Sequence, residues 1–376
     1  MQSSWFRRYL LPGIVFQSAV IGGGYGTGRE IVEFFLSLGP VPGLAAMAVS
    51  TLIWSAVAAA TYEFARRFHV FEYRSFFKRL LGPAWVLFEV CYVTLLLLVV
   101  AVVGAAAGEI GVETLGIPYA VGVLGAMGTV ALLLVLGSGA IERALTAWSF
   151  VLYGVYIALM VWSLARFGPL ISDGLASSAL EGPWALNGVR YAGYNLSAGA
   201  VVLFTVRHIR TRGEAMTAGL LTGPIGMLPA FFFYLALVAF YPGVTNESLP
   251  ANFLLEMLGS RGFQILFQVV LFGTLIETGA GMIHAVNERV AATLRERGGE
   301  LPPWGRAAIA AVLLGLALSL TPLGLVDLIA SGYGTITWGF VLLYVVPVLT
   351  LGVWMLGRPG AAAAGQSEGP PQGDGS

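Results

Sequence analysis

The stretch Gly-Gly-Gly-Tyr-Gly-Thr-Gly, residues 22–28, lies inside an apolar run from about Tyr9 to Leu36, and Arg29 and Glu30 follow it directly. Each interior glycine costs a helix about 1 kcal/mol relative to alanine. Five glycines in seven positions therefore predict an interrupted helix. Within a bilayer, unpaired backbone is tolerated only where it lines a cavity or is buried in protein. The run predicts a binding site at mid-depth in a membrane.

The spacing of the glycines decides between a cavity, close helix packing and a nucleotide-binding loop. Gly22 with Gly26, and Gly24 with Gly28, form GxxxG pairs, which are typical of close helix packing. Packing explains two or three glycines but not five beside a threonine and an Arg-Glu pair. A nucleotide-binding loop is excluded, because the spacing fits neither GxGxxG nor GxxxxGK[ST] and no strand precedes the run.

The composition is that of a polytopic membrane protein. Hydrophobic residues make up 57% of the chain and charged residues 11%, and the mean hydropathy is +0.82, whereas soluble domains carry about 25% charged residues. Zero formal charge, one cysteine and three histidines give no nucleic-acid-binding, disulfide or metal-site pattern. We expect no enzyme activity, no metal, no resident cofactor and no nucleic-acid partner. The expected partners are a small-molecule solute and the lipid bilayer.

Ten apolar stretches are long enough to cross about 30 Å of hydrocarbon. They cover approximately residues 9–36, 42–65, 83–108, 118–138, 144–168, 187–206, 214–241, 262–290, 304–321 and 325–356. Sixteen of the twenty Lys and Arg residues lie at the ends or loops of one side, which by the positive-inside rule is the cytoplasmic side. We predict a multi-pass protein of a prokaryotic plasma membrane with both termini in the cytoplasm.

Two connections and the carboxyl-terminal tail have their own patterns. Residues 69–81 alternate aromatic and basic side chains and predict an interfacial amphipathic helix on the cytoplasmic face. Residues 246–259 predict a short outer helix with its cap near Asn246 or Ser248. Residues 357–376 are rich in Gly, Pro, Ser, Gln and Ala and are expected to be disordered. The single transporter domain therefore spans residues 1–356.

The ten spans divide into two halves of five, residues 9–168 and 187–356. An odd number of spans inserts the second half upside down relative to the first, which is the topology of an inverted repeat. The first span of the second half should then also be interrupted. It contains Gly193-Tyr194-Asn195-Leu196-Ser197-Ala198-Gly199, whose Asn, Ser and Gly residues favour turns and caps over helix interiors.

Two stretches carry a resemblance to a known group. Residues 22–35 (GGGYGTGREIVEFF) resemble the first-helix signature of the YkvI-type branch of the amino acid, polyamine and organocation (APC) transporter superfamily, and residues 325–340 (LVDLIASGYGTITWGF) are similar to its last-helix region. The resemblance implies an all-α, LeuT-type five-plus-five inverted repeat, with the solute held between broken helices one and six. It also implies that sodium, in sodium-coupled relatives, lies between span eight and the inner half of span one.

The chemistry expected at the two breaks follows from helix ends. Free amides at the start of the outer half of span one, near Thr27, stabilise an anion, and free carbonyls at the end of its inner half, near Ile21, suit a cation. The predicted solute-binding residues are Gly22, Gly23, Gly24, Tyr25, Gly26, Thr27, Gly28, Tyr194, Asn195 and Ser197.

Glu277 is the deepest ionisable residue of the ten spans, and such residues are functional candidates because burying them in a membrane is costly. Thr274 and Thr278 are four residues apart and share one helix face, with Glu277 adjacent to it. We predict that these three residues couple transport to an ion. Either Glu277 gains and loses a proton, or it joins the two threonines around sodium. The alternative is a structural ion pair with Arg29 or His284.

Arg29 and Glu30 are adjacent and therefore point about 100° apart on a helix. One is expected to face the cavity and the other a neighbouring helix. Both are candidate gate residues of the outer vestibule, and Glu30 could instead bind a substrate ammonium group. A structural role for Glu30 at a helix amino terminus is the competing interpretation.

The sequence as a whole predicts a secondary active transporter. It would move a small organic solute, an amino acid or an amine, by alternating access coupled to protons or sodium. The competing hypothesis is a membrane receptor that uses the same pocket to sense a solute without moving it.

Overall fold

The computed structural model describes residues 4–136 and 138–358, and within them every regular element is a helix. The first half contains α1 (Ser4–Tyr9), α2 (Leu11–Val20), α3 (Gly23–Gly26), α4 (Arg29–Phe34), η1 (Leu36–Leu38), α5 (Pro40–Phe68), α6 (Tyr73–Leu81), η2 (Gly82–Ala84), α7 (Trp85–Ile110), η3 (Gly111–Leu115), α8 (Tyr119–Leu136) and α9 (Ser138–Ala176).

The second half has the same number of long helical stretches. It contains α10 (Trp184–Asn195), η4 (Leu196–Ala198), α11 (Gly199–Val202), η5 (Leu203–His208), α12 (Arg212–Val238), η6 (Gly243–Asn246), α13 (Pro250–Leu258), α14 (Arg261–Glu296), α15 (Pro303–Leu320), η7 (Thr321–Leu323), α16 (Gly324–Asp327), η8 (Leu328–Tyr333), α17 (Gly334–Phe340), η9 (Val341–Val345), η10 (Val348–Gly352) and α18 (Val353–Gly357).

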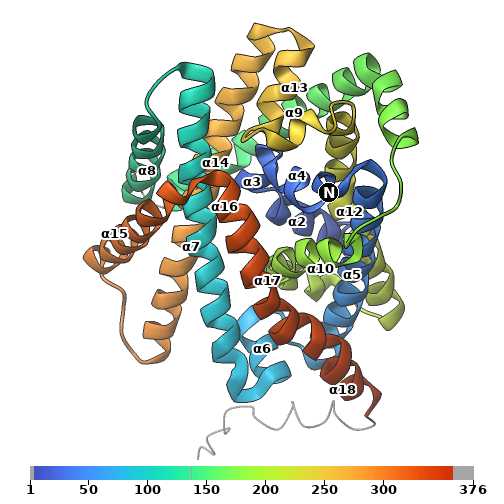
Figure 1. Ribbon diagram of the computed structural model, residues 1–376. Coiled ribbons are helices and arrows are strands. Elements are labelled where there is room, and N and C mark those ends of the chain that lie inside the picture. Colours follow the sequence, from blue (N-terminus) through green and yellow to red (C-terminus); the bar gives the residue numbers. More distant parts are fainter. Residues whose placement is uncertain (1–3, 137, 359–376) are drawn as a thin grey trace, which may run out of the picture.

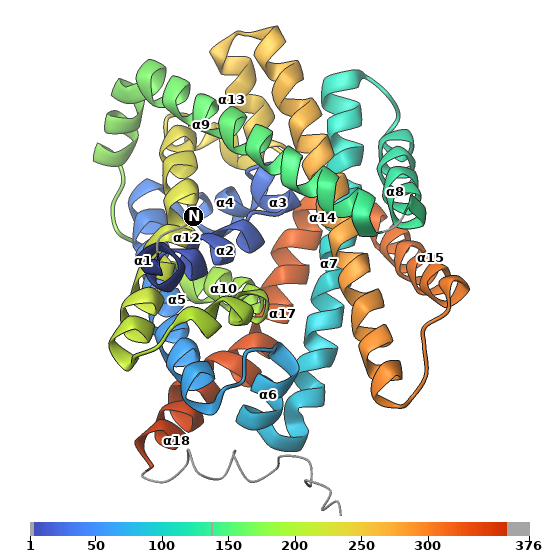
Figure 2. The same cartoon turned by 180° about the vertical axis from the view of Figure 1, so that it is seen from behind.

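Each of the ten predicted spans coincides with helix. Six helical stretches of the described chain are long and apolar enough to cross a membrane unaided, one of which, Pro303–Gly357, contains the last two spans; Leu11–Val20 and Tyr119–Leu134 are shorter apolar helices. Figures 1 and 2 place α8 and α15 on one flank and α5 and α12 on the other, with α2–α4, α10 and α14 between them. The interrupted segments are thus surrounded by the other helices.

The predicted interruption of the first span is present. Helix α2 ends at Val20, Ile21 is extended, and α3 is a single turn that ends at Gly26. Gly28 has φ +82°, the left-handed conformation that glycine adopts readily, and α4 begins directly after it. The glycine run therefore produces two breaks, on either side of α3, rather than one.

The corresponding stretch of the second half, residues 193–199, changes its helix type but is not broken. The α-helix ends at Asn195 and tightens to a 3₁₀ turn over Leu196–Ala198, but the backbone stays right-handed helical throughout. A Cβ at Gly193 would overlap Thr337, and one at Gly199 would overlap Tyr344. These two glycines therefore allow the helix to pack closely on the last span. They do not unwind it.

The two connecting helices lie close to their predicted positions. In α6 the side chains of Phe76, Phe77 and Leu80 are buried, and the ring of Phe77 stacks on Phe88. Its apolar face therefore packs against protein. Helix α13 begins at Pro250 after Leu249 without a side-chain cap, so the predicted cap at Asn246 or Ser248 was wrong: η6 already includes Asn246. The predicted disordered tail lies, from residue 359 on, outside the described residues.

Glycines of α12 hold the two halves together. A Cβ at Gly219 would overlap the backbone of Ala59 on α5, and one at Gly223 would overlap Thr51 and Ser55 of the same helix. Residues four apart share a helix face, so the glycines let α12 approach α5 backbone to backbone. This is the small-residue packing that replaces the hydrophobic effect between membrane helices.

The α5–α12 contact predicts a stability difference between two glycine substitutions. Gly219→Ala should lower the melting temperature in detergent by several degrees, because overpacking against fixed backbone costs about 1–3 kcal/mol. Gly125→Ala on α8, where an added Cβ meets nothing within 4 Å, is the matched control and should leave the melting temperature unchanged. Equal melting temperatures for the two variants would contradict the packing role of Gly219.

Candidate functional site

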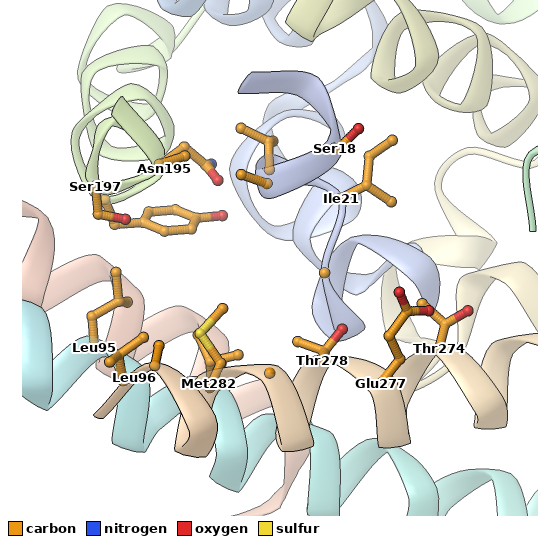
Figure 3. A pocket seen from close by; sticks show the side chains of 18 of the residues that line it. Ser18, Ile21, Leu95, Leu96, Asn195, Ser197, Thr274, Glu277, Thr278 and Met282 are labelled. Carbon is orange, nitrogen blue, oxygen red and sulfur yellow. The ribbon is translucent and has the colours of Figure 1, made fainter. Parts of the chain in front are cut away.

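A cavity of about 480 Å³ lies beside the first interruption. Its wall combines the carboxyl end of α2 with parts of α7, α9, α10, η4, α14 and η8. Figure 3 shows Glu277, Thr274 and Thr278 projecting from α14 toward the interrupted span, with Asn195 and Ser197 on another wall. Segments far apart in the sequence therefore meet at one site, as the predicted pairing of the two halves requires.

Most of the predicted residues outside the glycine run line this cavity. They are Glu30, Tyr194, Asn195, Ser197, Thr274, Glu277 and Thr278, together with Gly22 from the run itself. Thr274 is buried and its hydroxyl donates to the carbonyl of Val270 at 2.9 Å. Four of the ten predicted solute-binding residues thus face a common space with the three predicted coupling residues.

Residues 24 to 28 of the glycine run lie against protein instead. Gly23 is the first residue of α3. Tyr25 and Thr27 are fully buried, and the Thr27 hydroxyl donates to the Gly24 carbonyl at 2.9 Å. A Cβ at Gly26 would overlap Leu271, and one at Gly28 would approach Phe233 and Pro250. Within the described chain, none of the five residues from 24 to 28 is among those lining the cavity.

Glu30 faces the cavity from α4 and is 4% exposed. Its Oε2 accepts a hydrogen bond from the Tyr194 hydroxyl at 2.6 Å. The carboxylate also lies against Gly24, where any Cβ would overlap Oε1. Glu30 therefore connects the first spans of the two halves.

Arg29 lies outside the cavity wall and points toward the loop between α12 and α13. Its guanidinium donates to the carbonyls of Thr245 at 2.9 Å and Glu247 at 3.1 Å, and it forms an ion pair of 2.8 Å with Glu33. Only 7% of the side chain is exposed. The expectation that Arg29 and Glu30 face different surroundings thus agrees with the geometry.

Several tyrosines at the site were not identified from the sequence. The Tyr156 hydroxyl on α9 donates to the Gly26 carbonyl at 2.5 Å, which satisfies backbone freed by the interruption. Tyr92, Tyr153 and Tyr333 line the cavity, and the ring of Tyr333 stacks on Tyr194 with centroids 4.8 Å apart. Tyr333 lies in the stretch 325–340 already singled out, whereas a tyrosine within an apolar span gives no signal of its own.

A metal centre has no support in the described residues. Across 4–136 and 138–358, no group of three or more His, Cys, Asp and Glu side chains could hold a metal ion. The candidate ion-binding groups belong to residues that line the cavity. They are the carboxylate of Glu277, the hydroxyls of Thr274 and Thr278, and the backbone carbonyls at the carboxyl end of α2.

Comparison with known proteins agrees with the fold. No protein-family model matches the chain. The chain is 25% identical to YkvI, an uncharacterized membrane protein of Bacillus subtilis (strain 168), over 288 residues that cover 73% of this chain and 79% of YkvI. The resemblance expected from residues 22–35 and 325–340 is therefore confirmed.

Solved transporters share the architecture. The structure of MhsT in complex with L-phenylalanine matches with a TM-score of 0.59 and 17% identity, covering 95% of this chain and 97% of MhsT. A manganese transporter of Eremococcus coleocola, in complex with an aromatic bis-isothiourea substituted compound, matches at 0.53 with 16% identity and covers 92% and 78%. A Na⁺-coupled sialic acid symporter matches at 0.50 with 12% identity and covers 90% and 86%.

These likenesses confirm the expected LeuT-type fold. The chain is a multi-pass membrane protein with the architecture of solute transporters. The matched proteins are a membrane protein and transporters, which agrees with the prediction that the chain is not an enzyme.

The cavity predicts which introduced cysteines react with a thiol reagent. In a Cys91→Ser background, which removes the single native cysteine, Ser197→Cys and Thr278→Cys should be modified by a small methanethiosulfonate, because both positions line the cavity. Thr27→Cys should stay unmodified in the same time, because Thr27 is fully buried outside it. Mass spectrometry of the purified protein measures this. Modification of Thr27→Cys at the rate of Ser197→Cys would contradict the cavity boundary.

Proposed function

We propose that the protein is a secondary active transporter that moves a small organic solute, an amino acid or an amine, by alternating access. The observation that carries this proposal is the cavity beside the interrupted first span, which is lined by helices of both halves and contains two carboxylates, Glu30 and Glu277. Intramembrane ionisable groups are costly and mark solute or ion pathways. The membrane would be the plasma membrane of a prokaryote, with both termini in the cytoplasm.

Coupling is proposed to occur at Glu277, Thr274 and Thr278. These side chains share a cavity wall with Ala19, Ile21 and Gly22 at the carboxyl end of α2, where helix carbonyls carry partial negative charge. A proton on Glu277 or a sodium ion between the two helices would neutralise the same carboxylate. In either case the ion joins α2 to α14 and is released when they separate.

Two arginine contacts are proposed to act as gates on opposite sides of the cavity. Toward the predicted outside, Arg29 ties α4 to the loop containing Thr245 and Glu247. Toward the predicted cytoplasm, Arg8 of α1 pairs with Glu214 of α12 at 2.9 Å. Each contact fixes one end of the interrupted first span, so alternating access would require them to break in turn.

Replacement of Glu277 tests the coupling proposal. In proteoliposomes screened with a labelled panel of amino acids and amines, Glu277→Gln should lose uptake driven by a proton or sodium gradient and fall to the level without a gradient. Exchange of the same solute across the membrane at equal concentrations should persist, because the binding cavity remains. Glu288→Gln, on the same helix but paired with Arg306 at 2.6 Å, is the matched control and should keep gradient-driven uptake.

The outcome also separates transport from sensing. Uphill accumulation by Glu277→Gln at the wild-type rate would contradict the coupling role. Solute binding by the wild-type protein without uptake under any gradient would favour the receptor hypothesis and contradict transport.

Replacement of Arg29 tests the outer gate. Arg29→Gln should lower the uptake rate tenfold or more with little change in KM, because hydrogen bonds to charged groups contribute about 1.5–3 kcal/mol each and Arg29 does not line the cavity. Arg166→Gln, which changes an exposed arginine on α9, is the control. An unchanged uptake rate in Arg29→Gln would exclude Arg29 as a gate.

A further inference from the structure

We propose that the cavity selects organic cations that carry an ammonium group and lack a carboxylate, a narrower class than the amino acids and amines considered above. This inference rests on the proposed function, since it concerns the solute of the same cavity. Three features of the cavity support it: the groups already bound at the interruption, the charge of the wall, and the aromatic rings beside Glu30.

Two groups near the interruption that could donate to a solute carboxylate are already occupied. The backbone N–H of Arg29 donates to the Thr27 hydroxyl at 3.3 Å. The Tyr194 hydroxyl also donates to Glu30 at 2.6 Å. The Glu30 carboxyl group lies against Gly24 in the single turn of α3, beside backbone that would otherwise face a solute anion. Gly24 makes this possible, because a Cβ there would overlap Oε1 of Glu30.

The cavity wall contains carboxylates but no basic side chain. Glu30 and Glu277 both line it, and among its described lining residues there is no Lys, Arg or His. Arg29, adjacent to Glu30, donates to the carbonyl of Thr245 and pairs with Glu33 instead. Arg289 lies over the ring of Tyr92 but pairs with Glu89. A solute carboxylate would therefore meet like charge, whereas an ammonium group would be stabilised.

Aromatic rings beside Glu30 provide a further attraction for an ammonium group. Tyr194 and Tyr333 stack on each other next to the carboxylate, and Tyr92 and Tyr153 also line the cavity. Ring faces attract cations, more strongly where water is excluded. The remaining wall is largely aliphatic, with Leu95, Leu96, Val99 and Met282. A volume of about 480 Å³ with such a wall fits an amine with a hydrocarbon body, and the ammonium would lie between Glu30 and the tyrosines.

Matched pairs of compounds test this inference on the wild-type protein. Phenethylamine and L-phenylalanine differ by one carboxylate, as do 3-methylbutylamine and L-leucine. We expect each amine to bind the purified protein about tenfold or more tightly than its amino acid, measured by calorimetry and by thermal shift, because a charge-assisted hydrogen bond gives a discrimination of this size. Equal or tighter binding of the amino acids, or no binding by any amine, overturns the inference.

Substitution of Glu30 locates the selectivity. Glu30→Gln keeps the shape and can still accept from Tyr194, but it removes the charge, so amine binding should weaken by about tenfold or more. Glu181→Gln removes an exposed carboxylate between α9 and α10 and should bind amines as the wild type does. If Glu30→Gln retains wild-type amine affinity while it stays folded by thermal shift, Glu30 is not the ammonium site and the inference fails.

The experiment distinguishes this inference from the proposed function. Uptake of amino acids in preference to the matched amines overturns the inference and leaves transport intact. Amine binding that depends on Glu30 but leads to no uptake under any gradient supports the inference and contradicts transport.

Discussion

Backbone polar groups at the interruption of the first span must find partners within the protein, because lipid offers none. Each partner comes from a different element. Tyr156 of α9 donates to the Gly26 carbonyl, and the N–H of Ala251 in α13 donates to the Thr27 carbonyl at 2.9 Å. Satisfying the interruption therefore attaches α9 and α13 to one point, and the cavity lies beside it.

The short helix α4 joins the cavity to the loop between α12 and α13. Glu30 faces the cavity and Arg29 binds the carbonyls of Thr245 and Glu247, and the two residues are adjacent in a helix of six residues. A displacement of α4 that moves the Glu30 carboxylate toward a solute also displaces the Arg29 guanidinium. If Glu30 binds the solute and Arg29 acts as a gate, as proposed above, the two events would be linked through a single peptide bond, without a long pathway of side chains.

Much of the fold could be predicted from the sequence because lipid imposes simple rules. Apolar length gave ten spans that coincide with helices, and glycine density located the interruption at residues 21–28. Glu277 was identifiable because a carboxylate in an apolar span is costly. Tyr156 and Tyr333 were not, since a tyrosine is compatible with lipid, a helix interior or a cavity. Only their partners, Gly26 and Tyr194, distinguish these surroundings, and those contacts depend on tertiary structure.

The glycine-rich stretches of the two halves have different structural roles. The difference lies in which atoms a side chain at each glycine would contact. Gly193 and Gly199 meet Thr337 and Tyr344 of the last span, so they allow a continuous helix to pack closely. Gly24 meets the carboxylate of Glu30, which belongs to its own span. A larger residue at position 24 would overlap that carboxyl group. Glycine there leaves room for Glu30 beside the interruption, which is the position that the proposed ammonium site requires.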